Sequence, residues 1–220
     1  QRELKGDRLT GPQAGFGLAV HAAAAALVAG DDREPGQILA DLWGSVSYDA
    51  GWQADRERIE AEAAVARAAA WLATRPVPVR AEQRLDVQLP VRSAAGDIID
   101  RLRISGSADV VEVHDDHVLI WDYKTQRSAI AAADAVGNVQ LAVYQLAVEQ
   151  MVGVPARGAG LVQLCVAAGA AEPDQPKVRQ QPPVADLADR TSDLLVRSAG
   201  AIRDEQFTPT PGPGCRTCPF

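Results

Sequence analysis

The hydrophobic pattern is clearest in the middle of the chain, where two strand-like runs, 107–113 and 117–124, are separated by a three-residue polar link. A short polar link between two such runs predicts a β-hairpin. In the second run alternate residues point to opposite faces, and both faces carry apolar residues. This pattern predicts a central strand that is covered on both sides. Its two faces are Val118, Ile120, Asp122 and Lys124 on one side, and Leu119, Trp121 and Tyr123 on the other.

Periodicity predicts further elements on both sides of this hairpin. Helical spacing predicts helices over 15–30, 36–43, 53–73, 138–151 and 184–206, and alternation predicts strands over 79–89, 97–105 and 159–167. In the first helix we expect Leu18, Ala22, Ala25 and Ala26 to share a face, and in the third Ile59, Ala63, Ala66 and Ala70. Residues 170–183 contain four prolines and are predicted to be a polar loop. Trp43, Trp52 and Trp71 are interpreted as packing anchors, with a stacking platform for bases as the alternative.

This order of elements predicts an α/β fold, with a mixed central sheet, helices on both sides and a helical N-terminal extension. At 220 residues, one domain is expected. It divides into a mainly helical part (12–75), a sheet core with helices (76–206) and a cysteine-containing tail (207–220).

Composition narrows the function. The net charge is −7, with a pI near 5.0, which argues against a protein that grips nucleic acid over its whole surface. It leaves room for a local contact with nucleic acid and for a metal site, which needs acids. No apolar run approaches the roughly 20 residues that span a bilayer, and no signal-peptide pattern is present, so we expect a cytoplasmic protein without membrane contact.

The acids of the hairpin are the candidate chemistry. Burying Asp122 and Lys124 at a strand end is costly unless the charges are paired or hold a metal, and an ordinary ion pair is one reading. Asp109, on the partner strand, would lie near Asp122. Two carboxylates repel each other unless a cation lies between them, and oxygen ligands suit Mg²⁺ or Mn²⁺. Lys124 would then stabilise negative charge that develops on a phosphate.

Three motifs, in order, give the chain a family resemblance. Gly106-Ser-Ala-Asp109, Asp122-Tyr-Lys124-Thr125 and Gln140-Leu-Ala-Val-Tyr144 resemble the RecB-like branch of the PD-(D/E)XK nucleases. The resemblance implies the restriction-endonuclease-like fold and a Mg²⁺- or Mn²⁺-dependent exonuclease that hydrolyses DNA, single-stranded in our interpretation. It also implies a helicase motor, in the same parent chain or in a partner subunit, and a role in processing DNA ends for recombination repair.

The resemblance assigns roles to individual residues. Asp109 and Asp122 would hold the metal together with His21, which follows Gly17 in a G-x-x-x-H helix; a half-exposed helix histidine is the alternative. Lys124 would manage charge, and Gln140 and Tyr144, four residues apart on one helix face, would position phosphate. Site-supporting roles fall to Glu82, Thr125 and Arg127. For Glu82 a salt bridge to Arg80 or Arg84 is the competing reading, and for Arg127 phosphate contact is inferred from position alone.

The C-terminal Cys215-x-x-Cys218 has metal-ligand spacing. It matches two of the cysteines that hold a [4Fe–4S] cluster in related nucleases, but no cysteine precedes His21. We therefore expect such a cluster only in a longer parent chain, of which this sequence, beginning at Gln1, would be a fragment.

Two other functional classes remain to be compared. A catalytically silent DNA-binding or interaction module with the nuclease fold would be marked by loss of Asp109, Asp122 or Lys124, and all three are present. A small-molecule α/β enzyme would need a phosphate loop or a nucleophile motif, and neither occurs.

Overall fold

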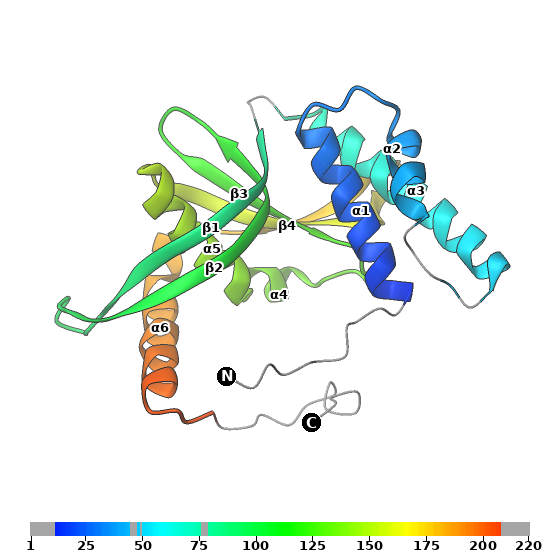
Figure 1. Cartoon of the computed structure of the whole chain (residues 1–220). Helices are drawn as coiled ribbons and strands as arrows, with labels where there is room; N and C mark the ends of the chain where they lie inside the picture. The colour runs from blue at the N-terminus through cyan, green and yellow to red at the C-terminus, as the bar shows by residue number, and fades with distance from the viewer. Residues whose placement is uncertain (1–11, 45–47, 49, 76–78, 208–220) are drawn as a thin grey trace.

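The computed structural model describes residues 12–44, 48, 50–75 and 79–207 (Figure 1). Three helices come first, and a sheet with further helices follows. The elements are α1 (Pro12–Val28), α2 (Pro35–Trp43), α3 (Gly51–Leu72), β1 (Val79–Arg92), β2 (Ile98–Val113), β3 (Val118–Lys124), α4 (Ala132–Val136), α5 (Val139–Val152), β4 (Ala156–Gly169), β5 (Glu172–Gln181), a 3₁₀ turn (Val184–Leu187) and α6 (Ala188–Arg203).

The sheet has five strands in the order β1-β2-β3-β4-β5. Neighbouring strands run antiparallel except for β3 and β4, which are parallel and are joined through α4 and α5. The mixed sheet and its helical N-terminal part confirm the fold class predicted from the sequence. Since β3 lies in the middle of the order, its predicted central position is also confirmed.

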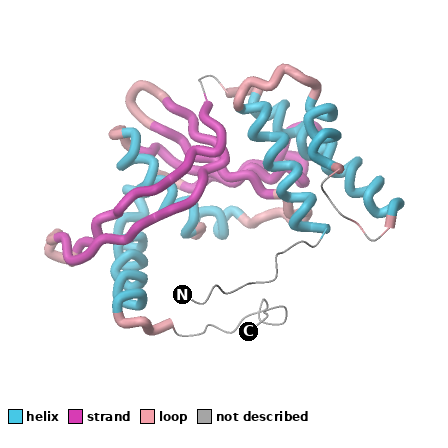
Figure 2. Tube along the Cα trace, in the orientation of Figure 1, coloured by secondary structure: helices cyan, strands magenta, loops and turns pink. Residues whose placement is uncertain are grey.

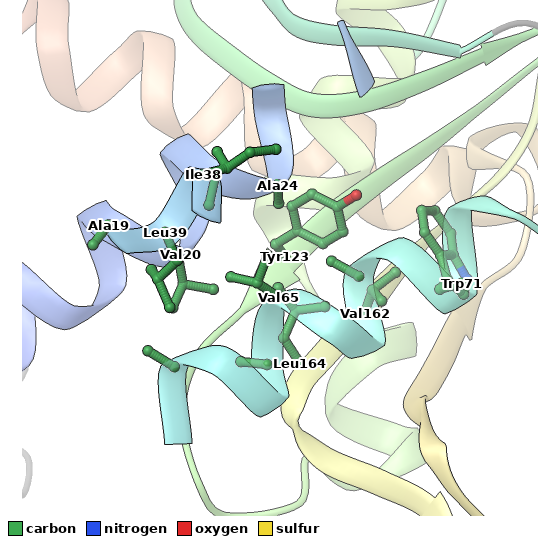
Figure 3. Close-up of a cluster of buried hydrophobic side chains, with 14 of the residues drawn as sticks. Ala19, Val20, Ala24, Ile38, Leu39, Val65, Trp71, Tyr123, Val162 and Leu164 are labelled. Atoms are coloured by element: carbon green, nitrogen blue, oxygen red, sulfur yellow. The ribbon is translucent and has the colours of Figure 1, made fainter. Parts of the chain in front are cut away.

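Two apolar clusters cover the two faces of β3. On one face Trp121 and Tyr123 pack with α1, α2 and α3, and Figure 3 shows part of this cluster around Tyr123, Val65 and Val162. On the other face Val118 and Ile120 pack with α5. Figure 2 shows the N-terminal helices gathered on one side of the strands and the later helices on the other. Each large apolar side chain that is fully buried here contributes on the order of 1.5–3 kcal/mol.

The β1–β2 hairpin extends beyond the rest of the sheet. The two strands pair from Val79 opposite Glu112 to Arg92 opposite Ile98, whereas β2 pairs with β3 only over Val110–Val113. The outer part of the hairpin is therefore a two-stranded ribbon, visible at the left of Figure 1. Val91 near its tip packs on Leu195 and Ala199 of α6.

The faces predicted for two helices are wrong. Leu18 of α1 is 72% exposed and Ile59 of α3 is 68% exposed, while the buried residues of α1 include Phe16 and Val20. The buried face of α3 is formed by Ala61, Ala64, Val65, Ala68 and Trp71. Trp52, predicted to be a packing anchor, is also exposed, whereas Trp71 is buried as predicted. Both helices are rich in alanine, which fits a buried or an exposed position, so periodicity does not fix their rotation.

The predicted polar loop at 170–183 is largely a strand, β5. It pairs with β4 alone and forms an edge of the sheet. Proline is tolerated on edge strands because one row of backbone N–H groups needs no ladder partner, which explains how Pro173 and Pro176 fit there. Among the described residues, no helix is long and apolar enough to cross a membrane.

Candidate active site

The candidate site lies where β2 separates from β3. Val110 pairs with Trp121, so the next residues to face each other are Asp109 and Asp122. The backbone ladder ends there, and the Asp109 carboxylate replaces it: Oδ2 accepts a hydrogen bond of 2.6 Å from the main-chain N–H of Tyr123. The predicted neighbourhood of the two acids thus follows from the register of the hairpin.

His21 reaches this point from α1. Its Nδ1 lies 3.4 Å from Asp109 Oδ1, and its ring packs edge-on against Tyr123 at 6.1 Å between centroids. Burial disfavours the charged imidazole, but the Asp109 contact and the negative charges of Asp109, Asp122 and Glu82 outweigh it, so the pKa of His21 is raised. His21 is therefore a partly exposed helix histidine that has an acidic partner, Asp109.

Asp122, Lys124 and Gln140 form a second group of contacting side chains. This group adjoins the pair of His21 and Asp109, because Asp122 lies opposite Asp109 in the strand register. Gln140 Nε2 donates a 2.9 Å hydrogen bond to Asp122 Oδ1, and Lys124 Nζ donates one of 3.4 Å to Gln140 Oε1. Lys124 Nζ also lies 2.7 Å from Asp122 Oδ2, so the ammonium group is the charge partner of this buried oxygen.

Asp122 is 4% exposed, and this buried environment changes the pKa of its carboxyl group. Burial raises the pKa of its carboxyl group, Lys124 opposes the rise, and the nearby charge of Asp109 adds to it. The net result is a raised pKa. A buried carboxylate that is destabilised in this way gains more from a nearby cation than an exposed one does.

Two glycines of the sequence motifs allow close approaches at the site. A methyl group at Gly106 would lie 3.2 Å from the Tyr144 hydroxyl, so the bare strand lets Tyr144 of α5 come against β2. A methyl group at Gly17 of α1 would lie 3.3 Å from Thr125 Oγ1, directly after the lysine strand. The spacing of these motifs therefore reflects contacts between elements that are far apart in the sequence.

Glu82 of β1 lies opposite Asp109 in the register. Its carboxylate accepts a 2.9 Å hydrogen bond from Ser107 Oγ, and no ion pair to Arg80 or Arg84 occurs in the described part of the chain. Its φ of 44° lies in the left-handed region that non-glycine residues rarely adopt, at a cost of the order of 1–3 kcal/mol. Glu82 thus borders the acid cluster in a strained backbone conformation.

The remaining predicted residues are less directly involved. Arg127 turns to Glu57 of α3 rather than to the acids, with 2.5 Å between Nη2 and Oε2. Cys215 and Cys218 lie outside the described residues.

Sequence reasoning missed two residues that hold the loop after Lys124. Gln163 of β4, fully buried and level with Lys124, accepts a 2.7 Å hydrogen bond from the Ile130 N–H through Oε1. Arg179 of β5 donates a 3.0 Å hydrogen bond to the Ile130 carbonyl through Nε. A polar residue within the apolar run of β4 was the signal that could have identified Gln163.

The donor set suits a hard divalent cation. Within the described residues, no three His, Cys, Asp or Glu side chains converge as a ready-made metal site. Each acid has an internal partner instead: Tyr123 N–H and His21 for Asp109, Lys124 and Gln140 for Asp122. Two carboxylates and an imidazole at one strand end, with the buried Asp122 oxygen already facing a cation, the Lys124 ammonium, nevertheless fit Mg²⁺ or Mn²⁺.

Comparison with known proteins identifies the family. The chain belongs to the PD-(D/E)XK nuclease superfamily, whose family model matches residues 2–220. The crystal structure of SSO0001 superposes with a TM-score of 0.43 at 13% identity, over 94% of this chain and 90% of that one. No curated protein gives a significant sequence match.

Proposed function

We propose that this chain is a single RecB-like nuclease domain that hydrolyses DNA phosphodiester bonds with the help of Mg²⁺ or Mn²⁺. The observation that carries the proposal is the meeting of Asp109, His21, Asp122 and Lys124 where β2 and β3 separate. Membership of the nuclease superfamily supports the reaction class. The finer features, exonuclease action on single strands and work with a helicase motor on DNA ends, rest on the motif resemblance, and the cytoplasmic location on the sequence pattern.

In this proposal His21, Asp109 and Asp122 would hold the divalent ion. When bound, such an ion polarises the phosphate and lowers the pKa of bound water. The chain's own residues supply the rest. Gln140 fixes the orientation of Asp122 through its 2.9 Å hydrogen bond. Lys124 places a positive charge where negative charge would develop on the phosphate, and that charge is most effective in the partly buried position it occupies. Tyr144, seated against Gly106, would bind a phosphate oxygen through its hydroxyl.

A second candidate is a catalytically silent DNA-binding module. One observation favours it: each acid is already paired within the protein, and Asp122–Lys124 is an ion pair at a strand end. An acid followed two residues later by a lysine is also the motif after which the PD-(D/E)XK superfamily is named. The Asp122–Lys124 ion pair alone therefore does not distinguish the nuclease from the silent module.

Cleavage assays on linear and circular single strands, and on duplex DNA, distinguish the candidates. We expect Mn²⁺- or Mg²⁺-dependent cleavage of linear single strands that EDTA and Asp122→Asn abolish and that Asp204→Asn, an exposed acid at the end of α6, leaves intact. Cleavage of circles would indicate an endonuclease. DNA binding without cleavage in any divalent metal would support the silent module.

A further inference from the structure

An ion pair lines a cavity beside the candidate active site. Arg127, three residues after Lys124, contacts Glu57 of α3, and so joins the sheet core to the helical part. The Arg127 side chain is 51% exposed, whereas that of Glu57 is 16% exposed. The hydrogen bond to Glu57 is the main reason that the pKa of Arg127 is raised, so the carboxylate is the chief partner of this guanidinium.

The cavity has a volume of about 360 Å³ and is lined by Phe16, Glu57, Thr125, Gln126 and Arg127. Thr125 directly follows the lysine of the site, which places the cavity at the catalytic end of β3. The Arg127 guanidinium lies over the Phe16 ring, 5.5 Å from its centroid. Trp43 packs edge-on against Phe16, with 6.3 Å between the ring centroids.

The loop that carries Arg127 has anchors other than the ion pair. Ile130 anchors that loop from both of its backbone groups, through Gln163 and Arg179. Arg127 is therefore available to exchange one anionic partner for another without loss of the loop's position. The Glu57 carboxylate resembles a DNA phosphate in that both offer anionic oxygens to the Arg127 guanidinium.

We propose that this cavity is a nucleotide subsite for single-stranded DNA, in which Arg127 binds a phosphate adjacent to the scissile one and Glu57 competes with the DNA for Arg127. The proposal rests on the proposed nuclease function, and it assigns a contact with the DNA substrate next to the candidate active site. A guanidinium beside an aromatic ring suits a single strand because its phosphates are accessible and its bases are free to stack. Because the chain has a net charge of −7, its surface as a whole repels DNA, and affinity for DNA must come from local cationic contacts such as this one.

Binding without catalysis tests the subsite. Anisotropy of a fluorescein-labelled oligothymidylate of about 15 nucleotides, measured in EDTA over a range of salt concentrations, gives both affinity and salt dependence. Arg127→Gln should weaken binding about tenfold and reduce the slope of log K against log salt by about 0.7, the contribution of one phosphate contact. Arg127→Lys should keep the slope. Glu57→Gln should tighten binding about threefold and leave the slope unchanged, because it frees a contact rather than adds one.

The matched control is Glu62→Gln, on the same helix and paired with Arg58 away from the cavity, which should bind as the wild type does. Combined with Arg127→Gln, the Glu57→Gln change should have no further effect, because the two residues act through one contact. Melting temperatures show that the variants are folded.

The outcomes separate this proposal from the nuclease activity. Arg127→Gln and Glu57→Gln variants that match Glu62→Gln in affinity and slope would overturn the subsite, even if Asp122-dependent cleavage is found. Wild-type protein that binds no oligothymidylate would overturn it as well. The expected changes in binding, without cleavage by the wild type in Mg²⁺ or Mn²⁺, would support the subsite and overturn the proposed catalysis.

Discussion

Asp109 Oδ2 and the main-chain N–H of Tyr123 are 2.6 Å apart, and this contact replaces the backbone pair that would have continued the β2–β3 ladder. The carboxylate therefore has a structural partner in addition to its proposed metal. These two roles are separable, because an amide side chain can accept the same hydrogen bond but is a much poorer ligand for a divalent cation.

We expect Asp109→Asn and Asp109→Ala to lose cleavage alike, by roughly 100-fold or more, and to differ in stability. The alanine variant leaves the Tyr123 N–H without its acceptor and should lose about 1–3 kcal/mol more than the asparagine variant. Both substitutions remove the same charge, so the difference between the unfolding free energies of the two variants, measured in urea, gives the contribution of the hydrogen bond from the Tyr123 N–H. Equal unfolding free energies would show that the contact contributes nothing.

Lys124→Gln should have opposite effects on metal binding and on cleavage. The ammonium group 2.7 Å from Asp122 Oδ2 competes with a cation for that oxygen, so its removal should tighten Mn²⁺ binding, by up to about tenfold. Cleavage should fall by roughly 100-fold because the charge opposite the phosphate is lost. Calorimetric titration with Mn²⁺ measures the first effect, and Lys177→Gln on β5 is the control for removing a lysine charge. Weaker Mn²⁺ binding in Lys124→Gln would contradict the competition.

Gly106→Ala should reduce turnover without unfolding the protein. The new methyl group would lie 3.2 Å from the Tyr144 hydroxyl, so the tyrosine must shift by a few tenths of an ångström. We expect kcat to fall roughly tenfold, since small displacements of positioning groups are costly. Gly169→Ala, in a strand glycine with open space around it, is the matched control and should behave as the wild type does. In a protein that already carries Tyr144→Phe, adding Gly106→Ala should lower kcat little further. A full tenfold loss of kcat in that double variant would show that Gly106→Ala does not act through the Tyr144 hydroxyl.

Gly160→Ala should be far more destabilising than Gly169→Ala, although both glycines lie in β4. A methyl group at Gly160 would stand 2.5 Å from Trp121 Cζ3 and 3.0 Å from the Arg179 carbonyl oxygen. The indole is packed against Trp71 at 5.4 Å between centroids and cannot move away freely. Overpacking of this kind costs about 1–3 kcal/mol or more, against about 0.5 kcal/mol or less at an open site. Denaturant unfolding of the two variants measures the difference, and similar stabilities would show that Trp121 yields easily.

The sheet core could be predicted from the sequence because its signals are local. The polar link at 114–116 and the alternation of 118–124 specify the hairpin and the central strand, and the structure has both. The register of that hairpin then brings Asp109 opposite Asp122, which is why the acids could be paired from the sequence alone.

The parts that were mispredicted depend on contacts that no short window contains. The alanines of α1 and α3 fit a core or a surface, so only the packed structure decides that Leu18 and Ile59 face outward. Pro173 and Pro176 argue against a strand unless it is known to lie at an edge. The partner of Arg127 is 70 residues earlier in the chain, and nothing around either residue identifies the other.

The β1–β2 ribbon leaves the sheet at the acids, and its apolar side packs on α5 and α6 as far as Val91, so only the turn beyond Val91 is independent of the geometry of the site. The turn that closes it, Ser93 to Asp97, is held by its own contacts, among them Ser93 N–H to the Asp97 carbonyl at 2.8 Å. Residues could be inserted or removed in matched pairs there without displacing Asp109 from Asp122. The closing turn is thus an adjustable tip, whose length can be changed by design while the chemistry at the base of the ribbon stays the same.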